Sequence, residues 1–333
     1  MSLDRPLAPV PIEAIEAACA RIAGIALRTP LVPLDLGAAT PGPVFLKLES
    51  LQPIGSFKLR GALNAIAARD PESLARGVWT ASAGNMAQGV AHAARTLGLA
   101  CTVVMPEHAP AAKRDAVVRL GGRVVSVPFD DWWRAIERHT HPGQEGAFVH
   151  PVCDPEVVAG NGTIGLEILE ELPEVATVLA PYGGGGLACG IASALAARRP
   201  QAAVYACEVA TAAPFAASLE AGEAVAIDHV PSFVDGIGGK SVLAPMWPAA
   251  RALLAGSLVV SLDQIAAAIR LLVARARVVA EGAGAASVAA ASQGRFAAGP
   301  IVCVVSGGNL DAAVLSEILA GRTPAPASSR AED

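Results

Sequence analysis

Short apolar runs alternate with longer amphipathic stretches along most of this chain. Residues 11–24 place Ile12, Ile15 and Ile22 on one helical face, which predicts an amphipathic helix. The apolar runs predict strands at residues 44–49, 77–82, 100–106, 122–128, 147–151, 177–182, 203–208, 257–261 and 300–305. The amphipathic stretches between them predict helices at about 57–69, 85–98, 109–121, 130–139, 156–171, 186–199, 261–277, 283–292 and 310–320. This alternation predicts an α/β fold with parallel-rich sheets flanked by helices, and so many strands favour two sheets.

Length and composition indicate a globular protein with two lobes. The 333 residues exceed the usual size of one hydrophobic core, and 53% of them are hydrophobic while 17% are charged. No apolar run approaches the roughly 18 to 20 residues of a membrane span. The first residues show no basic segment followed by an apolar one, so we expect no secretion signal. A net charge of −5 with dispersed signs argues against a nucleic-acid surface.

The six cysteines are scattered, with no CxxC pair and no metal-ligand spacing. Cys101, Cys207 and Cys303 fall in apolar runs that predict strands. We therefore expect reduced, buried cysteines and a cytoplasmic protein.

The stretch Pro53–Gly61 follows a predicted strand and leads into a predicted helix, which places Lys58 near the start of that helix. Only four of the 25 basic residues are lysines, so Lys58 stands out beside Phe57. A desolvated lysine can lose its proton and attack a carbonyl group to form a Schiff base, which arginine cannot do. The alternative is an ordinary first-turn lysine that points to solvent.

Two strand-to-helix turns carry small polar residues where the ligands of parallel sheets usually bind. In residues 82–89, Ser82, Asn85 and the free backbone N–H groups at a helix start suit a carboxylate, although a plain helix cap explains them equally well. In residues 306–309, Ser306 at the end of a strand could bond a cofactor ring, or simply close a turn.

A third turn contains four consecutive glycines, Gly183–Gly186, before a predicted helix. Four glycines let the backbone approach an anion closely, and the helix start directs its positive end there, so we favour a phosphate. A dinucleotide fingerprint is the alternative, because Gly183, Gly185 and Ala188 match it loosely and Glu208 ends the next predicted strand. That reading predicts an NAD-dependent oxidoreductase.

Together these stretches resemble the fold-type II pyridoxal-phosphate enzymes, in the threonine/serine dehydratase (ammonia-lyase) and serine racemase branch. Residues 56–61 resemble the Schiff-base lysine motif and residues 82–85 the loop that binds the substrate carboxylate. Residues 183–187 resemble the phosphate cradle, and residues 306–309 the site for the pyridine nitrogen. Residues 154–167 also resemble this branch.

The resemblance implies a large pyridoxal-phosphate-binding domain made of residues 1–76 and 153–320, and a small domain of residues 77–152, with the site between them. We expect the Pro/Ala/Ser-rich residues 321–333 to form a flexible tail. The resemblance also implies a homodimer. We expect no membrane or nucleic-acid partner.

The resemblance also assigns roles to individual residues. Lys58 would hold the cofactor and then take the proton from the substrate's α-carbon. Asn85 would bond the 3′-oxygen of the cofactor ring, and Ser306 its nitrogen. The implied cofactor-binding residues are Phe57, Lys58, Asn85, Gly183, Gly184, Gly185, Gly186, Leu187, Gly236, Glu281 and Ser306. The implied substrate-binding residues are Ser82, Ala83, Gly84, Asn85 and Met86.

A neutral serine at the ring nitrogen gives a weaker electron sink than a carboxylate would, which suits prompt loss of a β-hydroxyl group. The resemblance therefore implies a lyase that removes water from a β-hydroxy-L-amino acid of the threonine or serine type, giving a 2-oxo acid and ammonia. A racemase or a cysteine synthase-like β-replacement enzyme is the alternative within the fold.

Three positions depart from the pattern of the resemblance. Met86 stands where many relatives have histidine, and Ala83 stands where the racemases have a serine. In relatives with a divalent-metal site, the ligands match Glu208, Ala212 and the position of Pro214. Proline supplies no ligand side chain, so we predict no strong metal site.

Overall fold

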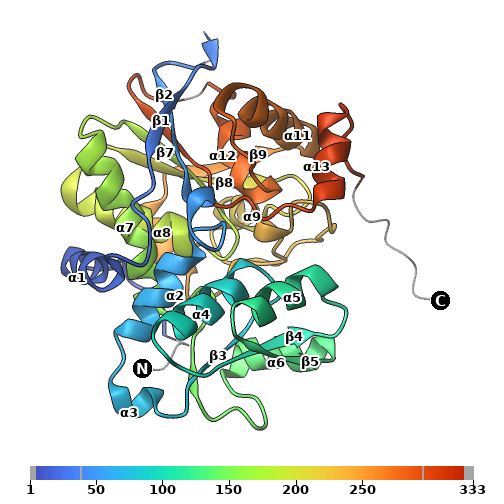
Figure 1. The fold of residues 1–333 in the computed structure, drawn as a ribbon. Helices are drawn as coiled ribbons and strands as arrows, with labels where there is room; N and C mark the ends of the chain where they lie inside the picture. The colour runs from blue at the N-terminus through green and yellow to red at the C-terminus, as the bar shows by residue number, and fades with distance from the viewer. Residues whose placement is uncertain (1–4, 38–39, 295, 326–333) are drawn as a thin grey trace.

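The computed structural model describes residues 5–37, 40–294 and 296–325 (Figure 1). Its strands are β1 Leu31–Leu34, β2 Val44–Lys47, β3 Val78–Ala81, β4 Cys101–Pro106, β5 Arg123–Val127, β6 Ala147–Phe148, β7 Thr177–Pro181, β8 Ala203–Val209, β9 Gly256–Val260 and β10 Ile301–Val304. Its α-helices are α1 Ile12–Ile22, α2 Lys58–Ala67, α3 Pro71–Leu74, α4 Asn85–Thr96, α5 Ala111–Arg119, α6 Phe129–Arg138, α7 Pro155–Glu171, α8 Gly186–Arg198, α9 Pro214–Ala221, α10 Trp247–Leu253, α11 Leu262–Leu271, α12 Gly282–Ala291 and α13 Ala312–Leu319. Most of the tail expected at residues 321–333 lies outside the described residues. Residues 1–4 lie outside them as well.

The larger sheet has the strand order β1-β2-β10-β7-β8-β9. All its neighbouring pairs are parallel except β1 with β2. The sequence pattern missed β1, because this strand has only four residues and Pro33 interrupts it. Proline is tolerated there because β1 lies at the edge of the sheet.

The smaller sheet has the order β5-β4-β3-β6, and all its strands are parallel. Helices α4, α5 and α6 accompany it in the lower part of Figure 1. The predicted α/β fold with two parallel-rich sheets is therefore confirmed, while the domain limits at residues 77 and 152 stay a prediction. Strand β6 is shorter than the predicted 147–151, because the backbone turns at residues 150–153 to enter α7.

Helices α2, α7 and α8 pack closely because glycines line their contacts. A Cβ atom on Gly160 would come within 2.5 Å of the Arg60 carbonyl oxygen, and one on Gly190 within 2.5 Å of the Val158 carbonyl oxygen. Larger residues at these two positions would push the helices apart. This close approach fixes α2, and with it Lys58, against α7, which in turn packs against α8.

Three short helices were not predicted from the sequence. Helices α3, α9 and α10 each have a proline in the first turn, but their alanine-rich or brief patterns show no clear periodicity. The predicted helix 261–277 is also interrupted, since α11 ends at Leu271 and a π-helical turn follows at Leu272–Ala276. Among the described residues, no helix combines the length and the apolar character needed to cross a bilayer.

A buried cluster of ionic side chains joins α2, β2 and α7. The Arg60 guanidinium donates to both oxygens of Glu49 at 2.8 Å and to the two oxygens of Glu167 at 2.6 and 2.9 Å. Lys47 Nζ lies 2.7 Å from Glu167 Oε2. Arg60, Glu49 and Lys47 are each at most 1% exposed.

The ion pairs in this cluster favour the charged forms of Arg60 and Glu49 despite their burial. Burial disfavours the charged guanidinium, but the Glu49 carboxylate and hydrogen bonds to Glu49 and Glu167 raise the pKa of Arg60. Burial likewise opposes ionisation of Glu49, yet Arg60, Thr29 and Lys47 hold the pKa of Glu49 below its usual value. Arg60 and Glu49 therefore stay ionised, and removing one of them would leave the other as an unpaired buried charge.

Replacing Arg60 by methionine should cost about 3 to 5 kcal/mol of unfolding free energy, because Glu49 would lose its main partner in a buried site. The control is Arg76→Met, since Arg76 pairs with Glu145 on the surface and both side chains are 70% exposed. We expect that control to cost at most about 1 kcal/mol. Denaturant unfolding measures both changes, and equal costs would contradict the role of the buried cluster.

Candidate functional site

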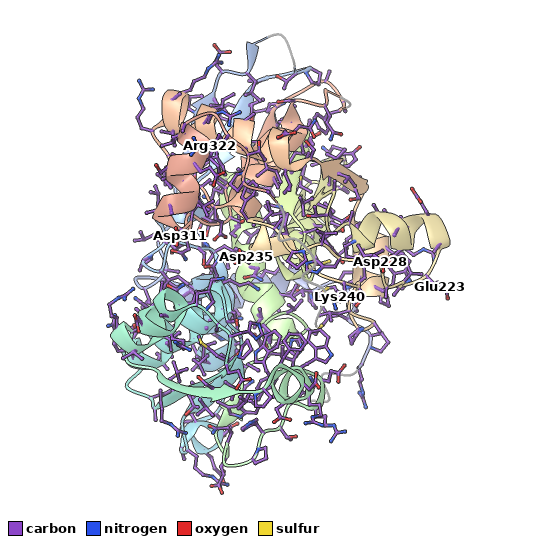
Figure 2. The ribbon with its side chains drawn as sticks, turned by 90° about the vertical axis from the view of Figure 1, so that its right-hand side faces the viewer. Glu223, Asp228, Asp235, Lys240, Asp311 and Arg322 are labelled. Carbon is purple, nitrogen blue, oxygen red and sulfur yellow. The ribbon has the colours of Figure 1, made fainter. Side chains whose placement is uncertain are left out.

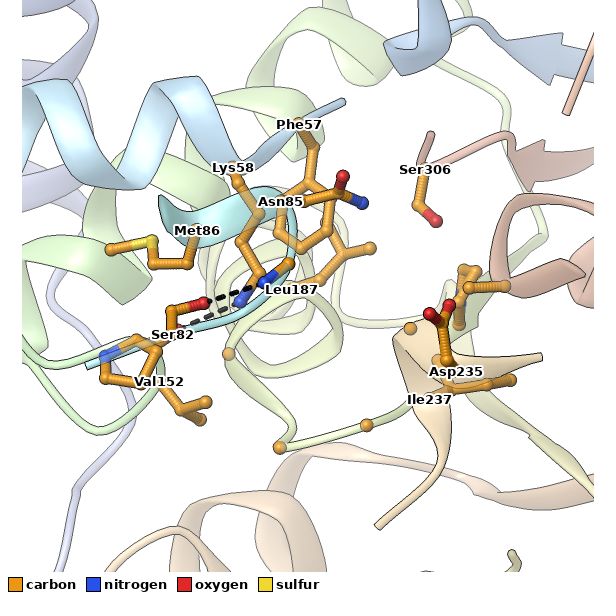
Figure 3. A pocket seen from close by; sticks show the side chains of 18 of the residues that line it. Phe57, Lys58, Ser82, Asn85, Met86, Val152, Leu187, Asp235, Ile237 and Ser306 are labelled. Atoms are coloured by element: carbon orange, nitrogen blue, oxygen red, sulfur yellow. Dashed lines mark hydrogen bonds between the residues drawn. The ribbon is translucent and has the colours of Figure 1, made fainter. Parts of the chain in front are cut away.

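Segments from seven parts of the chain enclose a cavity of about 210 Å³ (Figure 3). They are the start of α2, the loops that follow β3, β7 and β10, the turn before α7, the short turn Asp235–Ile237 and the start of α12. The lining residues are Phe57, Lys58, Ser82, Gly84, Asn85, Met86, Pro151, Val152, Pro181, Gly183, Gly184, Gly185, Gly186, Leu187, Asp235, Gly236, Ile237, Glu281, Ala283 and Ser306. The cavity lies at the carboxyl ends of parallel strands, where the ligands of such sheets bind.

Lys58 is the first residue of α2, and its side chain extends into the cavity rather than into solvent. Its Nζ donates a hydrogen bond of 2.9 Å to the carbonyl oxygen of Pro151 and lies 5.3 Å from the centre of the Phe57 ring. Burial lowers the pKa of Lys58 from 10.5 to about 8, although Cys153 and Glu281 act in the opposite direction. A useful fraction of this amine is therefore neutral near physiological pH, as a nucleophilic lysine requires.

The four-glycine turn Gly183–Gly186 leads from β7 into α8, and its two central residues leave no room for a Cβ atom. A Cβ atom on Gly184 would lie 2.5 Å from Val152 Cγ2, and one on Gly185 would lie 2.8 Å from Met246 Cγ. Gly185 also has a φ of +92°, which favours glycine. The backbone N–H groups and the positive end of α8 meet at the cavity, as an anion site requires.

Main-chain contacts bring the lysine motif next to the loop after β10. The Phe57 N–H donates to the Ser306 carbonyl oxygen at 3.0 Å, and the Gly308 N–H donates to the Gly55 carbonyl oxygen at 2.9 Å. Ser306 is buried and lines the cavity, and Figure 3 shows the Asn85 side chain extending toward it. Residues about 250 positions apart in sequence thus share one wall.

The Asn85 amide is held from both sides by the larger part of the molecule. Its Nδ2 donates to Glu281 Oε1 at 2.8 Å, and its Oδ1 accepts from Asn309 Nδ2 at 2.8 Å. Burial and the charge of Asp235 raise the pKa of Glu281 to about 8, although the Asn85 hydrogen bond acts against this shift. The surroundings of Glu281 therefore favour its protonated form over the form of an exposed carboxylate.

The loop after β3 divides its residues between the cavity and the small lobe's core. Ser82, Gly84, Asn85 and Met86 line the cavity, as expected from the sequence. Ala83 is not among the lining residues, and its methyl group packs against the apolar cluster around α4. Successive side chains in an extended segment point in different directions, which the motif alone did not reveal.

Glu208 lies away from the cavity, with both carboxylate oxygens in use. They accept from the Phe215 and Ala216 N–H groups at 2.8 Å, and the Ser257 hydroxyl donates to Oε2 at 2.5 Å. The carboxylate therefore holds the start of α9. This position does not support the ribose contact that the dinucleotide alternative required.

Six lining residues are not among those assigned from the sequence: Pro151, Val152, Pro181, Asp235, Ile237 and Ala283, although Asp235 and Ile237 flank the assigned Gly236. Pro151 acts through its carbonyl oxygen, which has no sequence signature. Asp235 pairs with Lys113 Nζ at 2.5 Å, although Lys113 lies on α5 beside the smaller sheet. Figure 2 places Asp235 where the parts carrying the two sheets face each other.

The comparison with protein families gives one match over most of the chain. The family model described as "Pyridoxal-phosphate dependent enzyme" matches residues 22–307. The L-threonine ammonia-lyase of Geobacter sulfurreducens is 43% identical over 83% of this chain and 70% of its own length. A serine racemase of Oryza sativa subsp. indica is 34% identical over 92% of this chain and 93% of its own length.

Solved structures give the same result. Maize serine racemase has a TM-score of 0.85 at 32% identity and covers 94% of this chain and 98% of its own. The processed form of threonine deaminase isoform 2 from Solanum lycopersicum has a TM-score of 0.83 at 31% identity, covering 96% and 98%. The chain belongs to the family of pyridoxal-phosphate dependent enzymes, in the fold-type II branch that contains threonine ammonia-lyases and serine racemases.

Proposed function

We propose that this chain is a pyridoxal-phosphate-dependent lyase that removes water from a β-hydroxy-L-amino acid of the threonine or serine type. The products are a 2-oxo acid and ammonia. The observation that carries the proposal is the cavity in which the amine of Lys58 and the four-glycine turn lie together. The relatives named as threonine ammonia-lyases and threonine deaminases support the same reaction.

The residues of the cavity fit pyridoxal phosphate. The group needs an amine for its aldehyde, an anion site for its phosphate and polar contacts for its ring. Lys58 has the lowered pKa of a reactive amine. The glycine turn is a cradle in which a Cβ atom on Gly184 or Gly185 would clash with its neighbours. Ser306 and Asn85 both line the cavity and supply the polar contacts.

Each side chain has a specific task in this proposal. When bound, pyridoxal phosphate withdraws electrons from the α-carbon of the substrate through its conjugated ring. Lys58 holds the cofactor and then removes the α-proton, because its Nζ lies inside the cavity. Ser82 and the N–H groups at the start of α4 hold the substrate carboxylate, since this helix begins at the cavity. Asn85 donates to the ring oxygen.

Ser306 favours elimination because its side chain is uncharged. A neutral hydroxyl group can donate a hydrogen bond to the ring nitrogen without forcing it to be protonated. Ser306 would in this way leave the bound ring a weaker electron sink than a carboxylate partner would, which would favour prompt loss of the β-hydroxyl group once Lys58 has taken the α-proton. The product is an unsaturated amine that hydrolyses to the 2-oxo acid and ammonia.

We also infer a homodimer in the cytoplasm, with a large and a small domain divided at residues 77 and 152. The two sheets support the division, because β3 to β6 form one sheet and the other six strands form the second. Light scattering of the purified protein measures the oligomeric state.

The purified holoenzyme should be yellow, and borohydride should fix the cofactor to Lys58. The rate at which apoprotein captures pyridoxal phosphate should rise with pH and level off above about 8, because only the neutral amine attacks and the pKa of Lys58 is lowered to about 8. Peptide mass spectrometry locates the label. Lys58→Arg should abolish it, whereas Lys240→Arg on the surface should not. A colourless protein that binds NAD would contradict the proposal.

In an assay of β-hydroxy amino acids, L-threonine or L-serine should give the fastest release of a 2-oxo acid. The apolar side chains of Met86, Val152 and Ile237 beside the cavity suit a small uncharged substrate side chain. The comparison reaction is O-acetylserine with sulfide. Faster turnover of that pair than of any hydroxyamino acid would indicate a β-replacement enzyme instead.

Racemisation should be slower than elimination. It needs a proton donor on the cofactor face opposite Lys58, because one base serves one face of a planar carbon. Ala83 has no exchangeable proton and does not line the cavity. The measurement follows D-serine and pyruvate formed from L-serine in deuterated water. Comparable rates of the two products would overturn this expectation and favour the racemase alternative.

A further inference from the structure

His150 lies in the turn between β6 and α7 and accepts two backbone hydrogen bonds on one ring nitrogen. The N–H groups of Val152 and Cys153 donate to its Nδ1 at 3.0 and 2.8 Å. A nitrogen that accepts two hydrogen bonds carries no proton, so the proton of this neutral imidazole lies on Nε2. His150 is only 5% exposed, and burial lowers its pKa to about 3, with the charges of His139 and Lys58 acting in the same direction.

Aromatic packing fixes the ring itself. His150 meets the ring of Phe148 edge-on at 6.0 Å and the ring of His139 edge-on at 5.3 Å between centroids. Phe148 belongs to β6, so the ring is attached to the smaller sheet. The acceptor at Nδ1 is therefore held in place before any ligand binds.

The turn that His150 holds contacts both halves of the proposed cofactor site. The carbonyl oxygen of Pro151 accepts from Lys58 Nζ at 2.9 Å. The side chain of Val152 fills the space beside Gly184, where a Cβ atom would come within 2.5 Å of Val152 Cγ2. A shift of this turn would thus move the partner of the amine and the support of the glycine turn together.

We propose that His150 is a positioning residue whose Nδ1 fixes the turn 151–153, so that Pro151 directs the Lys58 amine and Val152 supports the glycine turn. The inference rests on the proposed role of Lys58 in holding the cofactor. His150 itself does not line the cavity and does not contact the reacting atoms. Its effect passes through the main chain of the next three residues.

The test removes the acceptor while keeping the ring. His150→Phe retains an aromatic side chain against Phe148 but leaves the N–H groups of Val152 and Cys153 without a partner. We expect it to lower the affinity of the apoprotein for pyridoxal phosphate by about tenfold or more, because a lost hydrogen bond to a buried donor has this cost. The affinity of His150→Asn apoprotein for pyridoxal phosphate should stay within about threefold of the wild-type affinity, because an asparagine oxygen can accept from N–H groups two and three residues ahead.

The matched control is Asp154→Ala. Asp154 caps α7 by accepting from the Glu156 N–H at 2.9 Å, immediately after the turn, but it does not hold residues 152 and 153. It should lower the melting temperature while leaving cofactor affinity near that of the wild type. Cofactor affinity is measured by titrating apoprotein with pyridoxal phosphate and following visible absorbance. Borohydride labelling of Lys58 is the second readout.

A direct measurement accompanies these variants. Hydrogen exchange of the Val152 and Cys153 amides should be slow in the wild type and in His150→Asn, and fast in His150→Phe. If His150→Phe does not fold, His150→Ala replaces it, since it lacks the acceptor and introduces no bulk.

The outcomes separate the two proposals. If the wild-type protein takes up no pyridoxal phosphate at Lys58, the proposed function itself fails. If the wild type is labelled and His150→Phe binds the cofactor equally well, only the role of His150 is overturned. The role of His150 is also overturned if His150→Asn binds pyridoxal phosphate as weakly as His150→Phe does. The same holds if Asp154→Ala weakens cofactor binding as much as His150→Phe does.

Discussion

The ion pairs of Arg60 are the constraint on which the position of the site depends. Arg60 follows Lys58 by two residues on α2, and its guanidinium binds Glu49 after β2 and Glu167 on α7. A planar guanidinium with five donors fixes orientation as well as distance. Helix α2 therefore cannot rotate about its axis without breaking several buried hydrogen bonds. This rigidity keeps Lys58, the first residue of the helix, directed into the cavity.

The rest of the site is assembled by contacts that cross between the two sheets. Asn85 begins a helix beside the smaller sheet, yet both of its amide atoms bond residues beside the larger one. Lys113 and Asp235 make a second link. The Lys113–Asp235 pair is exposed to water and so contributes little, whereas the bond from Asn85 to the buried Glu281 is shielded from it. Lys58 and the glycine turn, by contrast, lie at the starts of α2 and α8, two helices that pack in the buried part of the larger lobe.

The sequence predicted those features of the fold and the site that depend on residues close together along the chain. Alternating patterns located nine of the ten described strands, and the run Gly183–Gly186 predicted an anion site, because such a run has few other uses. The structure places this run at the cavity. The sequence pattern missed contacts made by backbone atoms, such as the Pro151 carbonyl oxygen that binds Lys58. It also missed the role of His150, since a histidine before a proline looks like any other turn residue. It expected Ala83 at the cavity, but this partly buried methyl group packs against the apolar cluster around α4.

The arrangement around Glu208 has a consequence for how the larger sheet is held to the helix α9. Three donors engage its carboxylate, two of them main-chain N–H groups at the start of α9. These N–H groups have no partner within the first turn of the helix, so the carboxylate satisfies them as a cap would. The third donor is the hydroxyl group of Ser257 on β9, while Glu208 itself belongs to β8. One buried carboxylate therefore cross-links β8, β9 and α9.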